Sequence, residues 1–320
     1  MTDYKNVKYK YPTVTLSGAT EGSPAEGDIW YDSGKFYLGT SRSFAGVWSS
    51  GGNLGTARAY LAGCGTQSAA LSISGHIAGS TNVTEEYNGS AWSAGGNVAT
   101  ARRHLGGTGT QSAGLCMGGY TNASYNVTEE YNGTSWSGGG NLSVAKNELS
   151  GAGTQSAGLC IGGNGPSNVT EEYDGSAWSA GGNLATARFG GAGGGTQSAA
   201  FFAGGNPSYS NVTEEYNGTS WSNGGTLGTG RTTMYGAGTQ NAGLCMGGYN
   251  GAYSNVTEEY DGTSWSSGGN LAAARGGHGA AGTTAAGLCF GKQSASNSTE
   301  EYDGPGTGSY DELFTTSQGL

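Results

Sequence analysis

The chain is poor in charge and has no long apolar run. Only 11% of its 320 residues are charged, and its 13 Lys and Arg residues are spread along the sequence. A surface that tracks phosphates needs clustered cations, so we expect no nucleic-acid binding. No stretch of 18 apolar residues occurs, so we expect no membrane insertion. Residues 1–16 lack a continuous apolar core and do not read as a signal peptide.

The signatures of common catalytic sites are missing as well. The three histidines have no metal-ligand spacing. No nucleophile motif stands out, no Tyr/His/Cys cluster suggests a copper oxidase, and no glycine-rich stretch opens a helix to cradle a phosphate. We therefore predict a protein that is not an enzyme and that uses no cofactor and no metal.

The chain contains five cysteines, too few and too regularly placed for a disulfide framework. Four of them occupy one position of a repeat, where the other two copies have Ser72 and Phe202: Cys116, Cys160, Cys245 and Cys289. Equivalent positions in neighbouring repeat units lie too far apart for a disulfide. We predict buried free thiols that behave as small apolar side chains, which favours assembly in a reducing cytosol. Cys64 has no assigned role.

What the sequence does have is a repeat. Thr-Glu-Glu-Tyr occurs six times, at intervals of 44, 42, 43, 44 and 42 residues, at 84–87, 128–131, 170–173, 213–216, 257–260 and 299–302. A fixed period of this length indicates an array of small units that bury their apolar faces against each other. The 66 glycines then mark frequent turns rather than disorder.

One repeat unit reads as four short strands, called a to d here. In the second unit, strand a ends near 109–111, strand b is 113–117, strand c is 126–131 and strand d is 135–137. Asn132-Gly133 between strands c and d predicts a type I′ hairpin turn. No helical period appears. Four antiparallel strands repeated six times predict an all-β fold, a six-bladed β-propeller.

The residues of the unit resemble the kelch repeat. The pattern is an Arg, a Gly-Gly after strand b, a Glu-x-Tyr and a Trp, here Arg102, 118–119, 129–131 and Trp136. The resemblance covers 44–304 and implies a kelch-like propeller. The WD repeat fits less well, because Ser and never Asp follows the repeat Trp.

The two ends of the repeat predict how the ring closes. The last Glu-Glu-Tyr, at 300–302, has no Trp after it, and Trp48 has no Glu-Glu-Tyr before it. We expect Val47-Trp48-Ser49 to supply the outer strand of the sixth blade, which leaves no open sheet edge. The predicted domains are an N-terminal attachment segment with a hairpin (1–43), the propeller (44–304) and a C-terminal tail (305–320).

The repeated polar residues predict scaffold contacts rather than a ligand site. The six Glu-Glu pairs supply 12 of the 23 acidic residues, and each unit also carries one cation, Lys146 in the third and Arg in the others. Successive strand residues face opposite sides, so one Glu per blade can point inward. We expect it to form an ion pair that stitches the blades together. The Asn-x-Thr sequons are copies of one position of the repeat, so together they count as a single observation. We interpret them as the starts of strands.

Differences between the units gather in two places, the loop between strands b and c and the start of strand a. Both lie on one face in an antiparallel blade, so we expect them to converge at the mouth of the central channel. Their Tyr, Asn, Ser and Gly content suits contacts with glycans or proteins; drift of exposed loops is the alternative. The candidate binding residues are Tyr60, Arg103, His104, Tyr120, Tyr125, Glu148, Phe189, Tyr209, Tyr235, Tyr249, Tyr253 and His278.

The N-terminal segment reads as a hairpin over 26–37 with its turn at 32–34. Its Gly-Asp-Ile-Trp-Tyr and Gly-Lys-Phe-Tyr strings resemble segments of tailed-phage fibre and appendage proteins, and the repeat resembles kelch-like proteins of marine bacteriophages. The resemblance implies a virion protein, assembled in the host cytoplasm, that is a tail fibre, a head fibre or a decoration protein. Its expected attachment residues are Trp30, Tyr31, Phe36 and Tyr37.

The sequence leaves three candidate functions. The first is a structural protein that joins other virion proteins through its N-terminal segment and displays the propeller to a host-surface glycan or protein. The second is an assembly protein whose propeller contacts other virion proteins. The third, an enzyme acting on surface glycans, needs two carboxylates, but Glu148 is the only acid among the variable residues. The sequence is compatible with a homo-oligomer.

Overall fold

The fold is all-β, as predicted. The computed structural model describes residues 29–32, 35–44 and 46–315, with side chains over 46–305. These residues form strands and turns and include no helix long and apolar enough to cross a membrane. The chain divides into two compact units, one from Gly46 to Gly304 and one made by the two ends of the chain.

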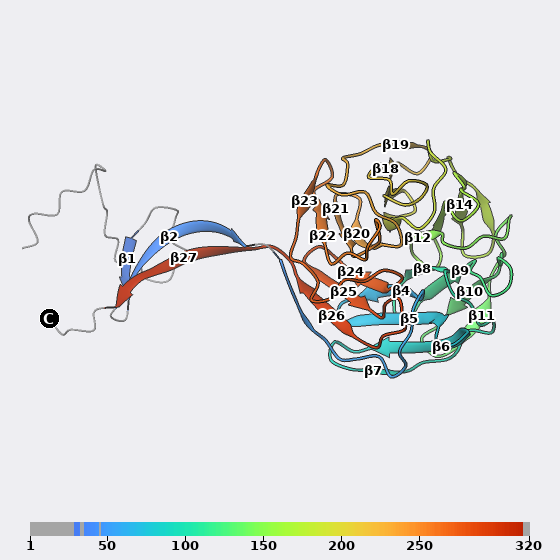
Figure 1. Ribbon diagram of the computed structural model, residues 1–320, viewed down its shortest axis with the longest axis horizontal. Coiled ribbons are helices and arrows are strands. Elements are labelled where there is room, and N and C mark those ends of the chain that lie inside the picture. The colour runs from blue at the N-terminus through green and yellow to red at the C-terminus, as the bar shows by residue number, and fades with distance from the viewer. Residues whose placement is uncertain (1–28, 33–34, 45, 316–320) are drawn as a thin grey trace, which may run out of the picture. The chain divides into compact units, whose positions relative to one another are not determined.

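The larger unit is a six-bladed β-propeller (Figure 1). Each blade is a four-stranded antiparallel sheet. The first three blades are β4 (Ala62–Thr66), β5 (Ala69–His76), β6 (Ser80–Tyr87) and β7 (Trp92–Ala94); β8 (Gly106–Gly109), β9 (Gly114–Met117), β10 (Thr128–Tyr131) and β11 (Trp136–Gly138); and β12 (Ser150–Gly153), β13 (Gly158–Ile161), β14 (Thr170–Tyr173) and β15 (Trp178–Ala180). The fourth and fifth are β16 (Ala192–Thr196), β17 (Ala199–Ala203), β18 (Thr213–Tyr216) and β19 (Trp221–Asn223); and β20 (Tyr235–Thr239), β21 (Ala242–Met246), β22 (Thr257–Tyr260) and β23 (Trp265–Ser267).

The sixth blade closes the ring as expected. It consists of β24 (Gly279–Gly282), β25 (Ala286–Phe290), β26 (Thr299–Asp303) and, as its outermost strand, β3 (Val47–Ser50). Trp48 pairs with Tyr302, so the start of the propeller completes its end. The innermost strands contact each other in order around the ring, from β4 through β24 and back to β4.

The turn between strands c and d differs from the prediction. In the second blade only Gly133, the first central residue, has a positive φ, of 87°. Asn132 is the residue before the turn, and its Oδ1 accepts the backbone N–H of Thr134 and of Ser135. A positive φ at the first central residue alone is the pattern of a type II′ turn, whereas type I′ needs it at both. The Asn side chain caps the turn from outside its two central residues.

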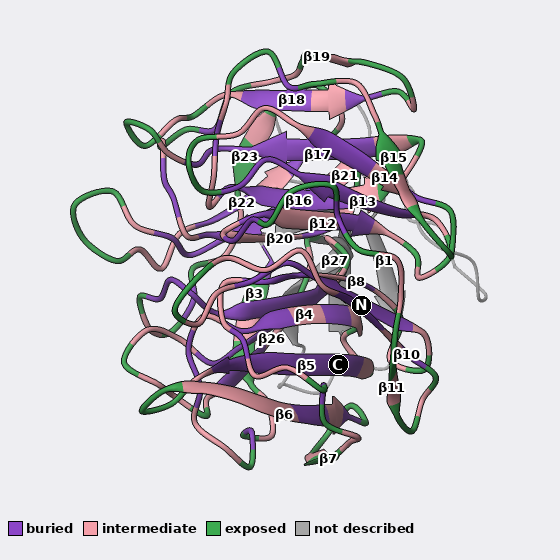
Figure 2. Cartoon of the chain, turned by 90° about the vertical axis from the view of Figure 1, so that its right-hand side faces the viewer, coloured by how far each residue is buried: buried purple, intermediate pink, exposed green. Residues whose placement is uncertain are grey.

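The core lies between blades rather than within them. One apolar cluster joins Leu71 of the first blade to Cys116 and Tyr131 of the second, and the other clusters repeat this pairing around the ring. Figure 2 shows that the buried residues lie mainly in the strands and the exposed ones in the loops. The innermost strands approach so closely that a Cβ on Gly151 would lie 2.6 Å from the Gly107 carbonyl oxygen. Glycine in strand a is therefore a packing requirement.

The smaller unit is a three-stranded sheet in the order β1 (Ile29–Asp32), β2 (Lys35–Phe44) and β27 (Gly306–Thr315). The predicted hairpin is present, although Ser33 and Gly34 of its turn lie outside the described residues. The segment from 305 onward does not form a separate tail up to Thr315, because β27 pairs with β2. The sequence contains no repeat that would have announced this pairing.

Candidate functional site

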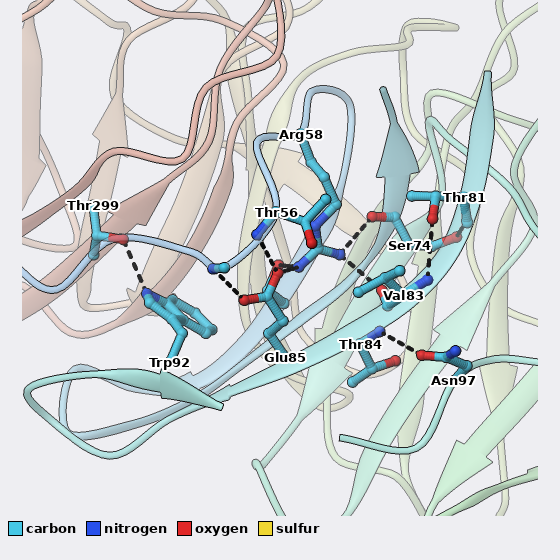
Figure 3. A network of polar contacts seen from close by, with 12 residues as sticks. Thr56, Arg58, Ser74, Thr81, Val83, Thr84, Glu85, Trp92, Asn97 and Thr299 are labelled. Atoms are coloured by element: carbon cyan, nitrogen blue, oxygen red, sulfur yellow. Dashed lines mark hydrogen bonds and ion pairs between the residues drawn. The ribbon is translucent and has the colours of Figure 1, made fainter. Parts of the chain in front are cut away.

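The first Glu of each Thr-Glu-Glu-Tyr forms a buried ion pair with the repeated cation. In the first blade, one guanidinium nitrogen of Arg58 donates to Glu85 Oε1 at 2.9 Å, and the other donates to the carbonyl oxygens of Ser74 and Val83 (Figure 3). Glu85 Oε2 also accepts the backbone N–H of Gly55 at 2.6 Å. The pair therefore fastens the connection between two blades to strands b and c of the following blade. The predicted stitching between blades therefore runs through this connection and not through a direct bond between two sheets.

The third blade has a weaker version of this pair. Lys146 Nζ lies 2.9 Å from Glu171 Oε1, but its direction satisfies no hydrogen bond among the described residues. In the second blade, Arg102 reaches two backbone carbonyl oxygens and Glu129. An ammonium is a compact point charge, whereas the planar guanidinium presents several donors at once.

The second Glu and the Tyr make the direct contact between neighbouring sheets. Tyr131 of the second blade donates its hydroxyl to Glu86 of the first at 2.5 Å and accepts the N–H of Gly96. The same contact occurs around the whole ring. Burial, followed by the bond to Glu86, raises the pKa of Tyr131 to about 12.

The Thr of the repeated tetrapeptide completes this set. Trp136 of the second blade donates its indole N–H to Thr84 Oγ1 of the first at 3.0 Å, and the other five blades repeat the bond. All four residues of Thr-Glu-Glu-Tyr thus have structural partners. The repeated tetrapeptide therefore belongs to the scaffold.

The cysteines and the sequon asparagines are also part of this scaffold. The four cysteines of the repeat position are free and buried, as predicted, and so is Cys64, for which no prediction was made. Burial raises the pKa of Cys64 to about 12. The Cys64 sulfur lies 3.8 Å from the Thr110 carbonyl oxygen, in the contact between the first two blades. The Asn126 side chain donates to the Leu142 carbonyl oxygen, and three equivalent asparagines do the same.

The two variable segments converge on one face. Arg103, just before strand a of the second blade, forms a bridge with Tyr120 in the b–c loop of the same blade, and Phe189 does so with Asn206 in the fourth. The repeated cation, one position earlier in the chain, forms a bridge with the b–c loop of the previous blade, as Lys146 does with Tyr125. The start of each strand a is therefore held between two b–c loops.

Six equivalent residues form a collar at the mouth of the channel. Each lies two positions after the repeated cation, and each has a left-handed backbone: Tyr60 (φ 52°), His104 (55°), Glu148 (52°), Gly190 (65°), Thr233 (49°) and Gly277 (60°). Backbone N–H groups link the collar from blade to blade, for example His104 to the Tyr60 oxygen at 2.9 Å and Glu148 to the His104 oxygen at 2.8 Å. At the fourth and fifth blades the Thr232 hydroxyl donates to the Gly190 oxygen at 3.4 Å.

The collar side chains enclose a cavity of about 30 Å³, enough for one water molecule. The Tyr60 and His104 rings stack with centroids 4.3 Å apart, and Glu148 and Tyr235 also line the cavity. Burial lowers the pKa of His104 to about 4, helped by Arg103. Burial raises the pKa of Glu148 above its ordinary value. The imidazole is therefore neutral at pH 7.

The remaining candidates lie on the rim, with one exception. The Arg103 guanidinium covers the Tyr120 ring at 5.2 Å from its centroid, and the Tyr125 hydroxyl accepts a hydrogen bond from Thr121. His278 is fully buried and packs against Tyr235 with ring centroids 5.1 Å apart. It occupies the position of Leu61 in the first blade, so it belongs to the core and not to the exposed face.

Three tyrosines meet at the b–c loops of the fourth and fifth blades. Tyr209, Tyr249 and Tyr253 line a second cavity together with Tyr60. Asn206 of the b–c loop in the fourth blade also lines this cavity, as do Thr232 and Thr233 before strand a of the fifth; none of the three was among the predicted binding residues. Only their position beside tyrosines from another loop reveals them, and no local pattern encodes that position.

The proposed attachment residues belong to the smaller unit. Trp30 pairs with Tyr37 and Tyr31 with Phe36 in the β1–β2 ladder. The structure describes the backbone of these residues and not their side chains.

Within the described residues, no three His, Cys, Asp or Glu side chains gather to form a metal site. No known protein family and no curated protein sequence matches the chain. Its architecture is nevertheless clear from its own geometry: the chain contains a closed six-bladed β-propeller with one variable face.

Proposed function

We propose that this protein is a non-enzymatic structural protein of a virion, a tail fibre, head fibre or decoration protein, that displays its propeller for attachment to a host-surface glycan or protein. The collar carries this proposal. Gly190 and Gly277 hold the left-handed backbone without strain, yet Tyr60, Glu148 and Thr233 hold the same backbone with a side chain. A left-handed β-branched or bulky residue is strained.

The left-handed backbone is common to all six blades and belongs to the frame, but glycine would hold it without strain at each position. The larger side chains at the other four positions therefore have no explanation in the scaffold. Strained residues cluster where a protein contacts a ligand. The four side chains, those of Tyr60, His104, Glu148 and Thr233, all line the mouth cavity. They differ from blade to blade, so they present an asymmetric surface on a nearly symmetric frame, which suits recognition of one particular partner.

The chemistry of the mouth supports a binding role. Glu148 is the one acid among the residues that line the mouth cavity. A glycosidase uses two carboxylates on either side of the scissile bond. His104, with its low pKa, is a poor general base at pH 7.

The virion assignment rests on the resemblance of the N-terminal strings and of the repeat to phage proteins. In this proposal the smaller unit contacts other virion proteins and the propeller faces outward. The variant Trp30→Ala/Tyr37→Ala removes two aromatic side chains from one pair of the β1–β2 ladder. We expect purified particles to lose this protein on immunoblots while the soluble protein keeps its thermal midpoint; particles that retain the variant would contradict the attachment role.

The attachment role is tested with the full-length protein on intact bacteria and on a panel of bacterial surface polysaccharides. We expect binding that Tyr60→Ala/His104→Ala abolishes. The matched control is Thr134→Ala/Thr219→Ala, in exposed turns at the opposite ends of the strands. Binding that survives the mouth variant would reject the proposal. Binding to purified virion proteins through the mouth would favour the assembly function instead.

A further inference from the structure

The face of the propeller is also hollowed beyond the collar. A cleft of about 250 Å³ lies between the b–c loops of the fourth and fifth blades. At about 30 Å³ per water, it holds the volume of roughly eight water molecules. It is lined by Tyr60, Asn206, Tyr209, Thr232, Thr233, Tyr249 and Tyr253.

The tyrosines of the cleft meet edge to face. The Tyr249 ring lies 5.9 Å from Tyr209 at 66° and 5.1 Å from Tyr253 at 64°. Tyr209 and Tyr253 remain 40% and 41% exposed, which is high for aromatic side chains held in contact. Ring faces turned in different directions leave a concave aromatic surface open to solvent.

Glycines of the sixth blade make room for this arrangement. A Cβ on Gly277 would lie 2.5 Å from Tyr60 Cδ1, and a Cβ on Gly276 would lie 3.1 Å from Tyr253 Cδ1. Both rings therefore occupy space that a side chain at 276 or 277 would fill. Burial first, and the neighbouring Tyr60 second, raise the pKa of Tyr253 above its ordinary value.

The second blade has an equivalent loop in which the tyrosine ring is covered. Its Tyr120 is equivalent to Tyr249, but Arg103 covers the ring. The residue equivalent to Arg103 in the fifth blade is Thr232, which is too short to reach over Tyr249. The cleft is open because a small residue replaces the long cation.

The lining defines the chemistry of the ligand. None of its seven residues is charged, and the chain has a net charge of −10, which disfavours an anion. Tyrosine faces accept an apolar surface, whereas the Asn206 amide and the Tyr hydroxyls bond polar groups. The Thr233 hydroxyl is buried and has no hydrogen-bond partner among the described residues. A ligand with one apolar face and an edge of hydroxyls meets both requirements.

We propose that this cleft binds one neutral pyranose unit of a surface polysaccharide. The C–H face of the sugar packs on Tyr249 and Tyr253, and its hydroxyls bond Asn206 and Thr233. The proposal rests on the attachment function and identifies the class of ligand.

The test uses the full-length protein and an array of neutral and acidic oligosaccharides, followed by saturation-transfer NMR with the methyl glycosides of neutral hexoses. We expect binding to neutral glycans, with saturation strongest on the C–H face of the ring. Tyr253→Ala should weaken binding by about 30-fold, the loss expected for an aromatic anchor. Thr232→Arg should do the same by covering Tyr249, as Arg103 covers Tyr120.

The exposed turns at the opposite ends of the strands provide the control. Thr134→Ala/Thr219→Ala lies outside both the collar and the cleft, so binding should not change. The thermal midpoint of each variant shows whether weaker binding results from loss of folding. The cleft proposal is overturned if only acidic glycans bind, or if Thr232→Arg leaves binding unchanged. The attachment function survives either result if Tyr60→Ala/His104→Ala still abolishes binding. Absence of binding to every glycan and every cell overturns both.

Discussion

The outer part of the blades and the mouth of the channel use the same repeat in opposite ways. Around the outside, six copies of Thr-Glu-Glu-Tyr make six copies of the same bonds to Trp and to the neighbouring blade, and each copy pairs with the repeated cation. At the mouth, six equivalent positions share one backbone conformation but carry Tyr, His, Glu, Thr and two glycines. Residues that are identical in all six blades are those that folding requires, and residues that differ between blades are those that folding leaves free.

This difference separates stability from recognition in the molecule. A substitution in the outer set should cost folding energy, whereas one in the collar should change binding and leave stability nearly intact. Three measurements test this division, in order of decreasing expected effect.

The largest effect is expected from Arg188→Met in the fourth blade. Arg188 and Glu214 have side chains only 1% exposed, and their atoms lie 2.8 Å apart. Removing the cation leaves a buried carboxylate without its partner, which costs about 3–5 kcal/mol. Chemical unfolding followed by tyrosine and tryptophan fluorescence measures the loss.

The collar supplies the control for this measurement. Burial raises the pKa of Glu148, so its carboxylate is less favourable in the folded protein than in the unfolded chain. Glu148→Gln should therefore lose no stability. Equal losses of unfolding free energy in Arg188→Met and Glu148→Gln would contradict the separation of a stabilising scaffold from a binding mouth.

A smaller effect, and of opposite sign, is expected at the buried His278. Both of its ring nitrogens lack hydrogen-bond partners among the described residues. Replacing a buried unpaired polar group with the Leu found at the equivalent positions should stabilise the protein by about 1–3 kcal/mol. Thermal unfolding of His278→Leu at pH 7 gives the gain, and Met234→Leu at the equivalent position of the fifth blade is the control.

The stabilisation by His278→Leu should grow in acid. Burial, followed by Arg275, lowers the pKa of His278 well below 6.5, so the folded state does not take up a proton that the unfolded state binds below about pH 6.5. The histidine therefore destabilises the protein increasingly as the pH falls through that value. A gain that stays constant between pH 7.5 and 5.5 would show that protonation is not involved.

The smallest effect is expected in the third blade. Lys146 makes one ion contact where the arginines of the other blades also bond backbone carbonyl oxygens. Lys146→Arg should gain about 1 kcal/mol from the added hydrogen bonds. Arg102→Lys should lose a similar amount, and a thermal midpoint that ignores both changes would mean that the extra guanidinium bonds contribute little.

Much of the fold was predictable because it rests on local and periodic signals. The spacing of the tetrapeptide fixed the number of blades, and the orphan Trp48 predicted the strand that closes the sixth. The register follows from the same residues, since Tyr302 pairs with Trp48 as every other repeat Tyr pairs with its Trp.

The site was predictable only in part. Sequence variation located the mouth and most of the tyrosines, but it also included His278, which is buried. A short segment does not record whether its side chain faces solvent or the neighbouring blade. For the same reason, the sequence could not distinguish the inner Glu85 from Glu86, which contacts the next sheet.

The sequence by itself determined the six blades, the closure of the ring and the status of Thr-Glu-Glu-Tyr as scaffold, because a period and a set of matched partners can be counted along a chain. Only the tertiary structure decided which residues meet at the mouth of the channel. The collar joins residues about 43 positions apart through backbone bonds. The cleft brings Tyr60 to Tyr249 and Tyr253 because the ring closes on itself. Such contacts depend on the curvature of the whole propeller, which no single repeat contains.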